Sequence, residues 1–344
     1  MANILVIRFS AIGDVAMTVP VIDSLARQYP ENQYTFVSQS FLAPLFAQCP
    51  DNVRFLGVDL YNDYKGVPGM YRLYRELLKQ KFDAVADLHD VLRTKLLRIF
   101  FRCSGLKVRH IDKGRKEKRQ LTRKENKIFR QLKPTTERYA DVLEAPPCSP
   151  QRGGIAMQKT GQRTLSPPSG GQGGLLGIAP FAKHESKIYP LDRMEQVVAH
   201  FAGRSDVKVF LFGGGAAEKA ILDEWCVKYP HVTSVAGKMK LSEELDLISR
   251  LDVMLSMDSA NMHLASLMGT PVVSVWGATH PYAGFYGYSQ PPENAVQVDL
   301  PCRPCSVYGN KPCYKKNNEC MTKITSEMVI EKISKIIFLP PFFA

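Results

Sequence analysis

The sequence of 344 residues has no long hydrophobic run. No apolar stretch approaches the roughly 20 residues that a membrane-spanning helix needs. The first residues, Met-Ala-Asn-Ile-Leu-Val-Ile, lack the basic start and the small-residue cleavage site of a signal peptide. We therefore expect a cytoplasmic protein.

Acidic residues are scarce relative to basic ones. The chain has 33 Asp and Glu against 45 Lys and Arg, so its net charge is +12. This imbalance indicates an acidic partner, and charge alone leaves open whether that partner is nucleic acid, an anionic membrane face or a phosphorylated substrate. The length and the hydrophobic content of 45% are typical of two globular domains.

Cysteine is also sparse, and its eight copies are unevenly spread. Four of them follow one another at Cys302, Cys305, Cys313 and Cys320. A small disulfide-stabilised scaffold is thereby excluded. Structural zinc, disulfides and reduced thiols all remain open for this cluster, because the spacing is short and irregular. We assign no metal to the active site.

The N-terminal stretch predicts the start of a doubly wound α/β domain. An apolar strand over Asn3 to Ile7 leads into a turn and then into apolar residues at helical spacing up to Tyr29. The turn has one glycine, Gly13, where a nicotinamide-dinucleotide fingerprint needs three, so that cofactor is excluded. It places Asp14 beside Arg8 and Ser10 at the strand's carboxyl end, where ligands bind in such sheets. Alternatively, Asp14 only stabilises the helix dipole.

Alternating strands and helices predict a parallel sheet covered on both faces. The expected strands are Tyr34 to Val37, Val53 to Val58, Ala84 to Asp87 and Lys107 to Ile111, and the expected helices surround Leu42 to Gln48, Met70 to Lys79 and Val91 to Phe101. His89, between Asp87 and Asp90, follows one of these strands and is a candidate for substrate contact. Capping of the next helix explains Asp90 equally well.

A basic segment runs from Lys113 to Lys133. Its cations are Lys113, Arg115, Lys116, Lys118, Arg119, Arg123, Lys124, Lys127, Arg130 and Lys133. A solvated loop, nucleic acid, anionic lipid and a phosphorylated acceptor are competing interpretations. No aromatic residue lies between Lys113 and Ile128, which disfavours a nucleic-acid stacking surface.

A Pro- and Gly-rich stretch near residues 145–174, with a short strand expected near Gly154 to Met157, indicates a linker before a second α/β domain. The expected strands of that domain are Leu175 to Ala179, Val207 to Phe212, Thr233 to Val235, Val253 to Met257 and Pro271 to Val275. The expected helices are Asp192 to Ala202, Glu218 to Tyr229, Ser242 to Ser249, Met262 to Met268 and Ser326 to Ile337.

Three features of this second domain suit a diphosphate. Lys183 and Lys187 share one loop at a strand's carboxyl end, and an ammonium neutralises charge on a departing phosphate. Gly213 and Gly214 allow close backbone approach. The turn at Asp258 opens a helix whose first N–H groups, at Ala260 to Met262, lack intrahelical partners and suit a phosphate. The structural alternative is an ordinary βαβ connection with Asp258 as the N-cap.

Three ordered motifs of this chain resemble those of glycosyltransferase family 9, the ADP-heptose:lipopolysaccharide heptosyltransferases. They are Arg8-Phe-Ser-Ala-Ile-Gly-Asp14, Lys187-x-Tyr-Pro190 and Asp258-Ser-Ala-Asn-Met-His263-Leu-Ala. Two positions differ from the family pattern, since Ala260 stands where the family has Gly and Tyr189 where it has Trp.

The resemblance implies a GT-B fold of two Rossmann-like domains. It assigns residues 1–150 to the acceptor, 151–174 to a linker and 175–325 to the nucleotide sugar, with residues 326–344 packing back on the first domain. It implies inverting transfer with no covalent intermediate, no metal and no cofactor. Asp14 would be the general base and Lys187 the cation on the diphosphate.

The implied donor is ADP-heptose and the implied acceptor an acidic lipid-linked lipopolysaccharide core at the inner membrane face, with no nucleic acid. The candidate donor contacts are Lys183, Gly213, Gly214, Asp258, Ser259, Ala260, Asn261, Met262 and His263. The candidate acceptor contacts are Arg8, Ser10, Gly13, His89, Arg115, Lys116, Lys118 and Arg119. Alternatives are a different nucleotide sugar, a non-catalytic nucleotide-binding protein and a nucleic-acid binder.

Overall fold

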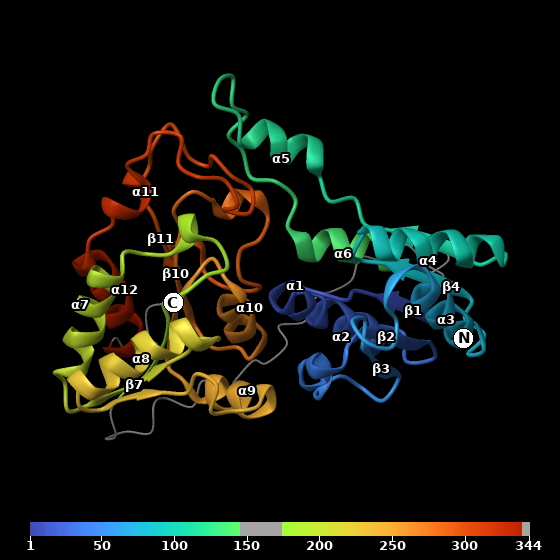
Figure 1. The fold of residues 1–344 in the computed structure, drawn as a ribbon, viewed down its shortest axis with the longest axis horizontal. Helices are drawn as coiled ribbons and strands as arrows, with labels where there is room; N and C mark the ends of the chain where they lie inside the picture. The colour runs from blue at the N-terminus through green and yellow to red at the C-terminus, as the bar shows by residue number, and fades with distance from the viewer. Residues whose placement is uncertain (145–173, 339–344) are drawn as a thin grey trace. The chain divides into compact units, whose positions relative to one another are not determined.

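The computed structural model describes residues 1–144 and 174–338, which form two compact units (Figure 1). The first contains residues 1–113 and 134–144, and the second contains residues 114–133 and 174–338. The predicted linker 151–174 and the predicted short strand near Gly154 lie outside the described residues, apart from Gly174.

The first unit is a five-stranded parallel sheet with strand order β3-β2-β1-β4-β5. Its strands are β1 (Asn3–Ile7), β2 (Gln33–Gln39), β3 (Val53–Val58), β4 (Ala84–Asp87) and β5 (Lys107–His110). Its helices are α1 (Ile12–Ala16), α2 (Val19–Gln28), the 3-10 helix η1 (Ser40–Phe46), α3 (Gly66–Leu78), α4 (Leu92–Cys103) and α6 (Thr135–Glu144). The apolar strands fill a core against α3 and α4, as a sheet buried on both faces requires.

The second unit is a six-stranded parallel sheet with strand order β11-β10-β9-β6-β7-β8. Its strands are β6 (Gly174–Ala179), β7 (Val207–Leu211), β8 (Val232–Ser234), β9 (Val253–Met257), β10 (Val272–Val275) and β11 (Ala295–Val296). Its helical elements are α5 (Arg115–Leu121), η2 (Glu185–Lys187), α7 (Leu191–Ala202), α8 (Ala216–Lys228), α9 (Leu241–Arg250), α10 (Ala260–Leu267), η3 (Pro281–Ala283), η4 (Pro292–Asn294), α11 (Glu319–Thr322) and α12 (Ser326–Phe338). Both sheets therefore have the predicted parallel α/β organisation.

The basic segment differs from its predicted place in the first domain. Residues 114–133 cluster with the second unit, where Leu121 and Leu132 are buried beside Ala283. Lys127 anchors the segment because its ammonium donates to three backbone carbonyls, the shortest contact being 2.7 Å to Arg303 O. Most side chains of the segment are exposed, so the solvated interpretation holds for them, but the segment is anchored to the second unit at Leu121, Lys127 and Leu132.

Helix α12 packs on the second sheet. Its residues Val329 and Ile333 are fully buried in the same core cluster as β6, β9 and β10. The prediction placed residues 326–344 on the first domain, whereas this apolar face is already buried within the second unit. In the described ranges, no helix combines the length and the apolarity that crossing a membrane requires.

Candidate active site

In the first sheet the chain changes direction between the neighbouring strands β1 and β4. The chain moves from β1 to β2 and β3 on one side, then returns to β4 and β5 on the other. At such a point the loops after two neighbouring strands run in opposite directions. They leave room for a ligand at the carboxyl edge of the sheet. Asp14 lies in α1 just after β1, and His89 follows β4. The structure thus brings together two predicted site segments that are distant in sequence.

Asp14 is held by Arg8 and stays accessible. The Arg8 guanidinium lies 2.9 Å from Asp14 Oδ2, and the Asp14 side chain is 34% exposed against 6% for Arg8. Burial disfavours the charge of Arg8, but the nearby Tyr139 and Asp14 outweigh it and raise the pKa of Arg8. Arg8 also donates to the carbonyl of Leu88, which fixes its orientation. Asp14 is therefore an oriented carboxylate that a ligand can reach.

Asp14 also occupies the first turn of α1, and the Ala11 N–H lies 3.4 Å from its Oδ2. The helix-dipole interpretation is therefore compatible with the ligand interpretation. Gly13 is buried at the start of the same helix, and Ser10 is half-buried in the loop before it.

His89 is a buried, neutral imidazole. Its Nδ1 accepts the Phe9 N–H at 3.4 Å, and its backbone N–H donates to Asp87 Oδ1 at 2.8 Å. Burial, reinforced by the cations of Arg8 and Lys113, lowers the pKa of His89 to about 3. At neutral pH His89 accepts a hydrogen bond rather than carrying charge.

Asp90 does not cap α4, because Val91 occupies the N-cap position. Its carboxylate instead lies 3.0 Å from the Arg98 guanidinium, which also reaches Asp87 at 3.4 Å. The capping interpretation is therefore wrong, and Arg98 instead ties Asp87 and Asp90 into one buried cluster below His89.

Acid is expected to destabilise the protein through His89. Because the folded pKa lies below the usual value of 6.5, the unfolded chain binds the proton more tightly. This contribution is complete above pH 6.5 and is lost as the pH falls toward about 3. Lowering the pH from about 7 to about 5 should cost about 2 kcal/mol of unfolding free energy through this group. Urea unfolding at both pH values measures it, and His89→Gln should flatten the dependence; an equal pH dependence in the variant contradicts the assignment.

The second sheet diverges between β6 and β9, which pair through Ala179 and Ser256. The loop after β6 carries Lys187, and the turn after β9 carries Asp258. Lys187 Nζ lies 3.1 Å from Asp258 Oδ2, and the side chains are only 14% and 8% exposed. The two predicted donor-site motifs therefore meet at the divergence point of their sheet.

Helix α10 begins directly beside this ion pair. Ser259 is its N-cap residue, with φ of −144°, and Ala260 is its first helical residue. The structural alternative that made Asp258 the N-cap is therefore wrong. The first-turn N–H groups of Ala260, Asn261 and Met262 have no intrahelical acceptor and carry the positive end of the helix dipole. This geometry suits an anion above the end of β9.

The side chains of this turn differ in how accessible they are to a ligand. Ser259, Ala260 and Asn261 are half-buried, whereas Met262 and His263 are 0% and 8% exposed. Met262 therefore presents its backbone rather than its side chain. Ala260 is not among the residues with positive φ, so the helix start does not depend on the glycine of the family pattern.

The glycine turn after β7 already has internal partners. The Gly214 N–H donates to Glu218 Oε2 at 2.7 Å, and a Cβ on Gly213 would lie 2.9 Å from Leu222 Cδ1. A carboxylate at this turn competes with a phosphate for the same N–H. Lys183 is exposed and lines a hollow of about 520 Å³ together with Lys311 and Lys316. Contact of these residues with a donor remains a prediction.

Gly309 is a residue that the sequence analysis missed. It has φ of +74°, and a Cβ there would lie 2.5 Å from Lys187 Cγ. Its carbonyl accepts the Ser186 hydroxyl at 2.6 Å, and its N–H donates to Ser306 Oγ at 3.0 Å. The loop after the first two clustered cysteines therefore holds Lys187 in place. One glycine in an irregular loop offers no sequence signal for this role.

The basic segment contributes cations of two kinds. Lys118 is 5% exposed and its ammonium lies 4.1 Å from the centroid of the Phe285 ring, so it packs α5 onto the rest of the second unit. Arg115, Lys116 and Arg119 are exposed on the same helix. These three cations, unlike Lys118, are accessible, and their contact with an acceptor stays a prediction.

The clustered cysteines form no disulfide, nor do Cys49, Cys103 and Cys226 elsewhere in the described chain. Over residues 1–144 and 174–338, no group of three or more His, Cys, Asp or Glu side chains is placed to hold a metal ion. Burial, with the neighbouring Cys313 and Cys302, raises the pKa of the Cys305 thiol. Tyr189, which replaces the Trp of the family pattern, is a core residue whose hydroxyl donates to Ile324 O at 3.0 Å.

Comparison with known proteins extends over most of the chain. A model of glycosyltransferase family 9 (heptosyltransferase) matches residues 70–315. The lipopolysaccharide core heptosyltransferase OpsX of Haemophilus influenzae is 24% identical over 97% of this chain and 96% of its own length. Lipopolysaccharide heptosyltransferase 3 of Escherichia coli is 25% identical over 78% of this chain and 80% of its own length.

Solved structures share the fold. The family 9 glycosyl transferase of Veillonella parvula has a TM-score of 0.72 at 20% identity and covers 98% of both chains. The E. coli heptosyltransferase WaaC with ADP has a TM-score of 0.66 at 18% identity, covering 97% of this chain and 99% of that one. These neighbours confirm the predicted GT-B fold class of two Rossmann-like units.

Proposed function

Because the chain belongs to glycosyltransferase family 9, we propose that it transfers a heptose from ADP-heptose to a lipopolysaccharide core precursor with inversion at the anomeric carbon. The names of its relatives support this choice of donor and acceptor, since OpsX is a lipopolysaccharide core heptosyltransferase and WaaC has been solved with ADP and with an ADP-heptose analogue. The observation that carries the proposal is the Lys187–Asp258 pair at the start of α10.

The second unit would stabilise the leaving nucleotide. As the anomeric bond breaks, negative charge grows on the diphosphate of ADP. The Lys187 ammonium and the first-turn N–H groups of α10 are already oriented when that charge appears, so they stabilise the transition state without reorganising. Asp258 holds the Lys187 side chain at 3.1 Å before the donor binds. No metal ion and no cofactor takes part in the proposed reaction.

The first unit would activate the acceptor. A sugar hydroxyl is a poor nucleophile, so a carboxylate within hydrogen-bond reach removes its proton as the new bond forms. Asp14 is the accessible carboxylate at the divergence point, and Arg8 orients it. The hydroxyl oxygen attacks the face of the sugar opposite the departing ADP, which inverts the anomeric carbon in one step. His89, which is neutral and accepts the Phe9 N–H, would lie beside this half-site.

The acceptor is proposed to be an acidic, lipid-linked saccharide at the cytoplasmic face of the inner membrane. Accessible cations of the basic segment, Arg115, Lys116 and Arg119, would attract its acidic groups. Nucleic acid is not a proposed partner.

Nucleotide preference tests this function directly. Thermal-shift measurements with ADP, UDP, GDP and their sugars should show the largest stabilisation by ADP and ADP-heptose, because a ligand that binds only the folded state raises its stability. A stronger response to UDP or GDP identifies a different donor. Equal responses to all diphosphates, together with binding of oligonucleotides, favour the nucleic-acid alternative.

Ala260→Gly should leave ADP affinity within about threefold of the parent value, because the α10 N–H groups keep their positions. The free energy of unfolding should fall by about 0.5–1 kcal/mol, since glycine loses more backbone entropy in a helix. Calorimetric titration of ADP and urea unfolding measure the two quantities. A gain in ADP affinity of tenfold or so, about 1.4 kcal/mol, would show that the helix start does require the family's glycine.

Gly309→Ala should slow transfer by about 100-fold, because a side chain at this position displaces Lys187 and small misplacements of catalytic groups are costly. Gly237→Ala is the matched control: Gly237 also has positive φ, +67°, but a Cβ added there would have no neighbouring atom within 4 Å. Initial rates at saturating donor measure the effect. If both variants slow transfer equally, backbone strain and not the Lys187 contact is the cause.

A further inference from the structure

The outer face of α3 and α4 exposes an unusual amount of apolar surface. Of the seven large hydrophobic side chains exposed in the described part of the first unit, five lie on these helices or in the loop before α3. They are Tyr61, Val67, Tyr71, Leu92 and Ile99, with exposed fractions between 46% and 85%. Exposed apolar residues gathered on one face mark an interaction surface.

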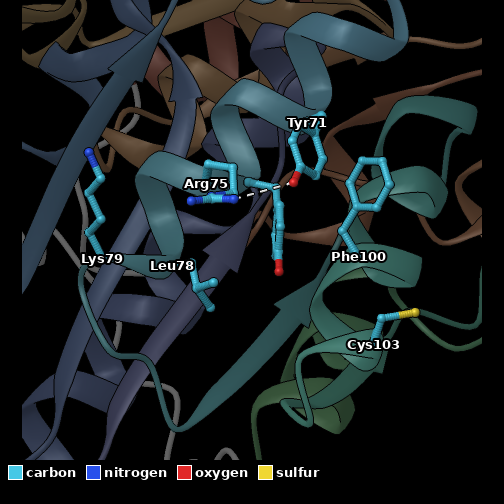
Figure 2. Close-up of a pocket in the computed structure, with 7 residues that line it drawn as sticks. Tyr71, Arg75, Leu78, Lys79, Phe100 and Cys103 are labelled. Atoms are coloured by element: carbon cyan, nitrogen blue, oxygen red, sulfur yellow. Dashed lines mark hydrogen bonds between the residues drawn. The ribbon is translucent and has the colours of Figure 1, made fainter.

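A hollow of about 430 Å³ lies on this face (Figure 2). The rings of Tyr71, Tyr74 and Phe100 meet there, with centroids 5.4 to 5.7 Å apart. Leu78 and Cys103 complete the apolar part of the lining. Arg75 and Lys79 also line it, and Figure 2 shows Arg75 reaching Tyr71, whose hydroxyl accepts from Arg75 Nη1 at 3.4 Å.

Basic residues outnumber acidic ones on α3 and α4. No Asp or Glu occurs from Val91 to Ile111, a stretch rich in Lys and Arg. Arg98 is buried against Asp87 and Asp90, which leaves Arg93, Lys95 and Arg102 as the accessible cations of α4. On α3, the carboxylate of Glu76 accepts the Tyr64 hydroxyl, while Arg72, Arg75 and Lys79 are accessible.

Helical spacing arranges these residues into an apolar centre with basic margins. On α4, Leu92, Ile99 and Cys103 fall on one stripe, and Lys95 and Arg102 lie along the side away from Phe100. On α3, Val67, Tyr71, Tyr74 and Leu78 fall on one stripe, and Arg72, Arg75 and Lys79 lie along the side away from α4. Tyr74 meets Phe100 between the two helices, so the stripes join.

We propose that this α3–α4 face docks on an anionic lipid bilayer. Aromatic side chains favour the headgroup level, and Lys and Arg bind lipid phosphates while their stems cover apolar surface. An apolar centre with cations on both margins and no acidic residue on α4 complements a bilayer of acidic lipids. The proposal rests on the proposed function in one respect: a lipid-linked acceptor would place the enzyme at a membrane surface.

The hollow, with its basic neighbours Lys79 and Arg102, lies away from the candidate active site. Helices α3 and α4 connect parallel strands, so they run antiparallel to the strands and their C-terminal halves lie toward the strands' amino ends. The hollow is lined by those C-terminal halves, whereas Asp14 lies at the carboxyl edge. Changes at Lys79, Ile99 and Arg102 should therefore leave the chemistry intact.

Vesicle flotation tests the proposal with the full chain. The protein should float with vesicles of equal parts phosphatidylethanolamine and phosphatidylglycerol and should stay unbound with pure phosphatidylcholine. Lys79→Gln/Arg102→Gln should weaken partitioning by about 25-fold, about fivefold for each cation removed. Ile99→Asn should also weaken it, by loss of the apolar contact. The matched control Lys208→Gln/Lys240→Gln removes two exposed cations of the second unit and should bind as the parent does.

Three results overturn the proposal. The first is no binding to acidic vesicles, and the second is equal binding by the parent and Lys79→Gln/Arg102→Gln. The third is a loss of vesicle binding only in Arg115→Gln/Lys116→Gln, which would move the contact to α5. Circular dichroism checks that each variant folds. Transfer to an acceptor without acyl chains should be unchanged in the docking variants. If the parent floats but transfers no heptose, the proposed function fails and the docking face stands.

Discussion

Asp14→Asn is expected to abolish glycosyl transfer while leaving ADP affinity nearly unchanged. The amide keeps the size of the side chain but cannot take the proton of the acceptor hydroxyl. General base catalysis contributes about 10²- to 10⁴-fold, so the rate should fall by that range. ADP affinity should persist because the residues proposed to bind the diphosphate lie in the second unit.

Two measurements separate this loss from misfolding. Calorimetric titration of ADP reports the donor half-site, and initial rates with saturating acceptor report the chemistry. Asp23→Asn is a matched control, since Asp23 is a carboxylate of the same unit that pairs with Arg27 at 2.9 Å on α2. Near-normal turnover in Asp14→Asn removes Asp14 from the role of base.

Lys187→Ala is expected to lower the transfer rate by about 10²- to 10³-fold and to weaken ADP binding. The Lys187 ammonium pairs with Asp258 at the start of α10. Removing one preorganised group that stabilises charge in the transition state typically lowers the rate by about 10²- to 10³-fold. The same substitution leaves Asp258 buried without its partner, which adds repulsion toward a diphosphate.

A double variant separates these two effects. In Lys187→Ala/Asp258→Asn the buried charge is gone as well, so ADP affinity should partly recover while the rate stays low. Lys208→Ala, on β7, removes an exposed lysine of the same unit and should change neither quantity. Unaltered ADP affinity and an unaltered rate in Lys187→Ala would reject its role on the diphosphate.

The strands were predictable because buried parallel strands are short apolar runs. Asn3–Ile7, Val53–Val58 and Ala84–Asp87 have the predicted bounds. The helix predicted up to Tyr29 is two helices, α1 and α2, because apolar spacing continues across the break at Met17 and Thr18. Pro20 in the first turn of α2 was the available signal for a new start.

The place of the basic segment was not predictable from its composition. A run of cations with few apolar residues is typical of a solvated loop. Its buried apolar residues Leu121 and Leu132 lie beside Ala283, and their separation of eleven positions has no recognisable period. The decisive contact, Lys127 with three carbonyls of the loop from Pro301 to Pro304, exists only in the folded chain.

Sequence patterns located the candidate site residues along the chain but did not give their geometry. Sequence patterns placed Asp14, Lys187 and Asp258 at strand ends, since polar turns after apolar strands are visible locally. That Lys187 and Asp258 form one ion pair follows from the adjacency of β6 and β9 in the sheet, which local patterns do not determine. Gly309, which holds Lys187, was missed for the same reason.

The most direct test of the central claim is a transfer reaction followed by mass spectrometry and by NMR of the anomeric carbon. The purified chain is incubated with ADP-heptose and a lipopolysaccharide core acceptor, with a metal chelator present. We expect one heptose added to the acceptor, one ADP released and an anomeric configuration opposite to that of the donor. Retention of configuration, or no product from ADP-heptose in a protein that binds ADP, would contradict the account.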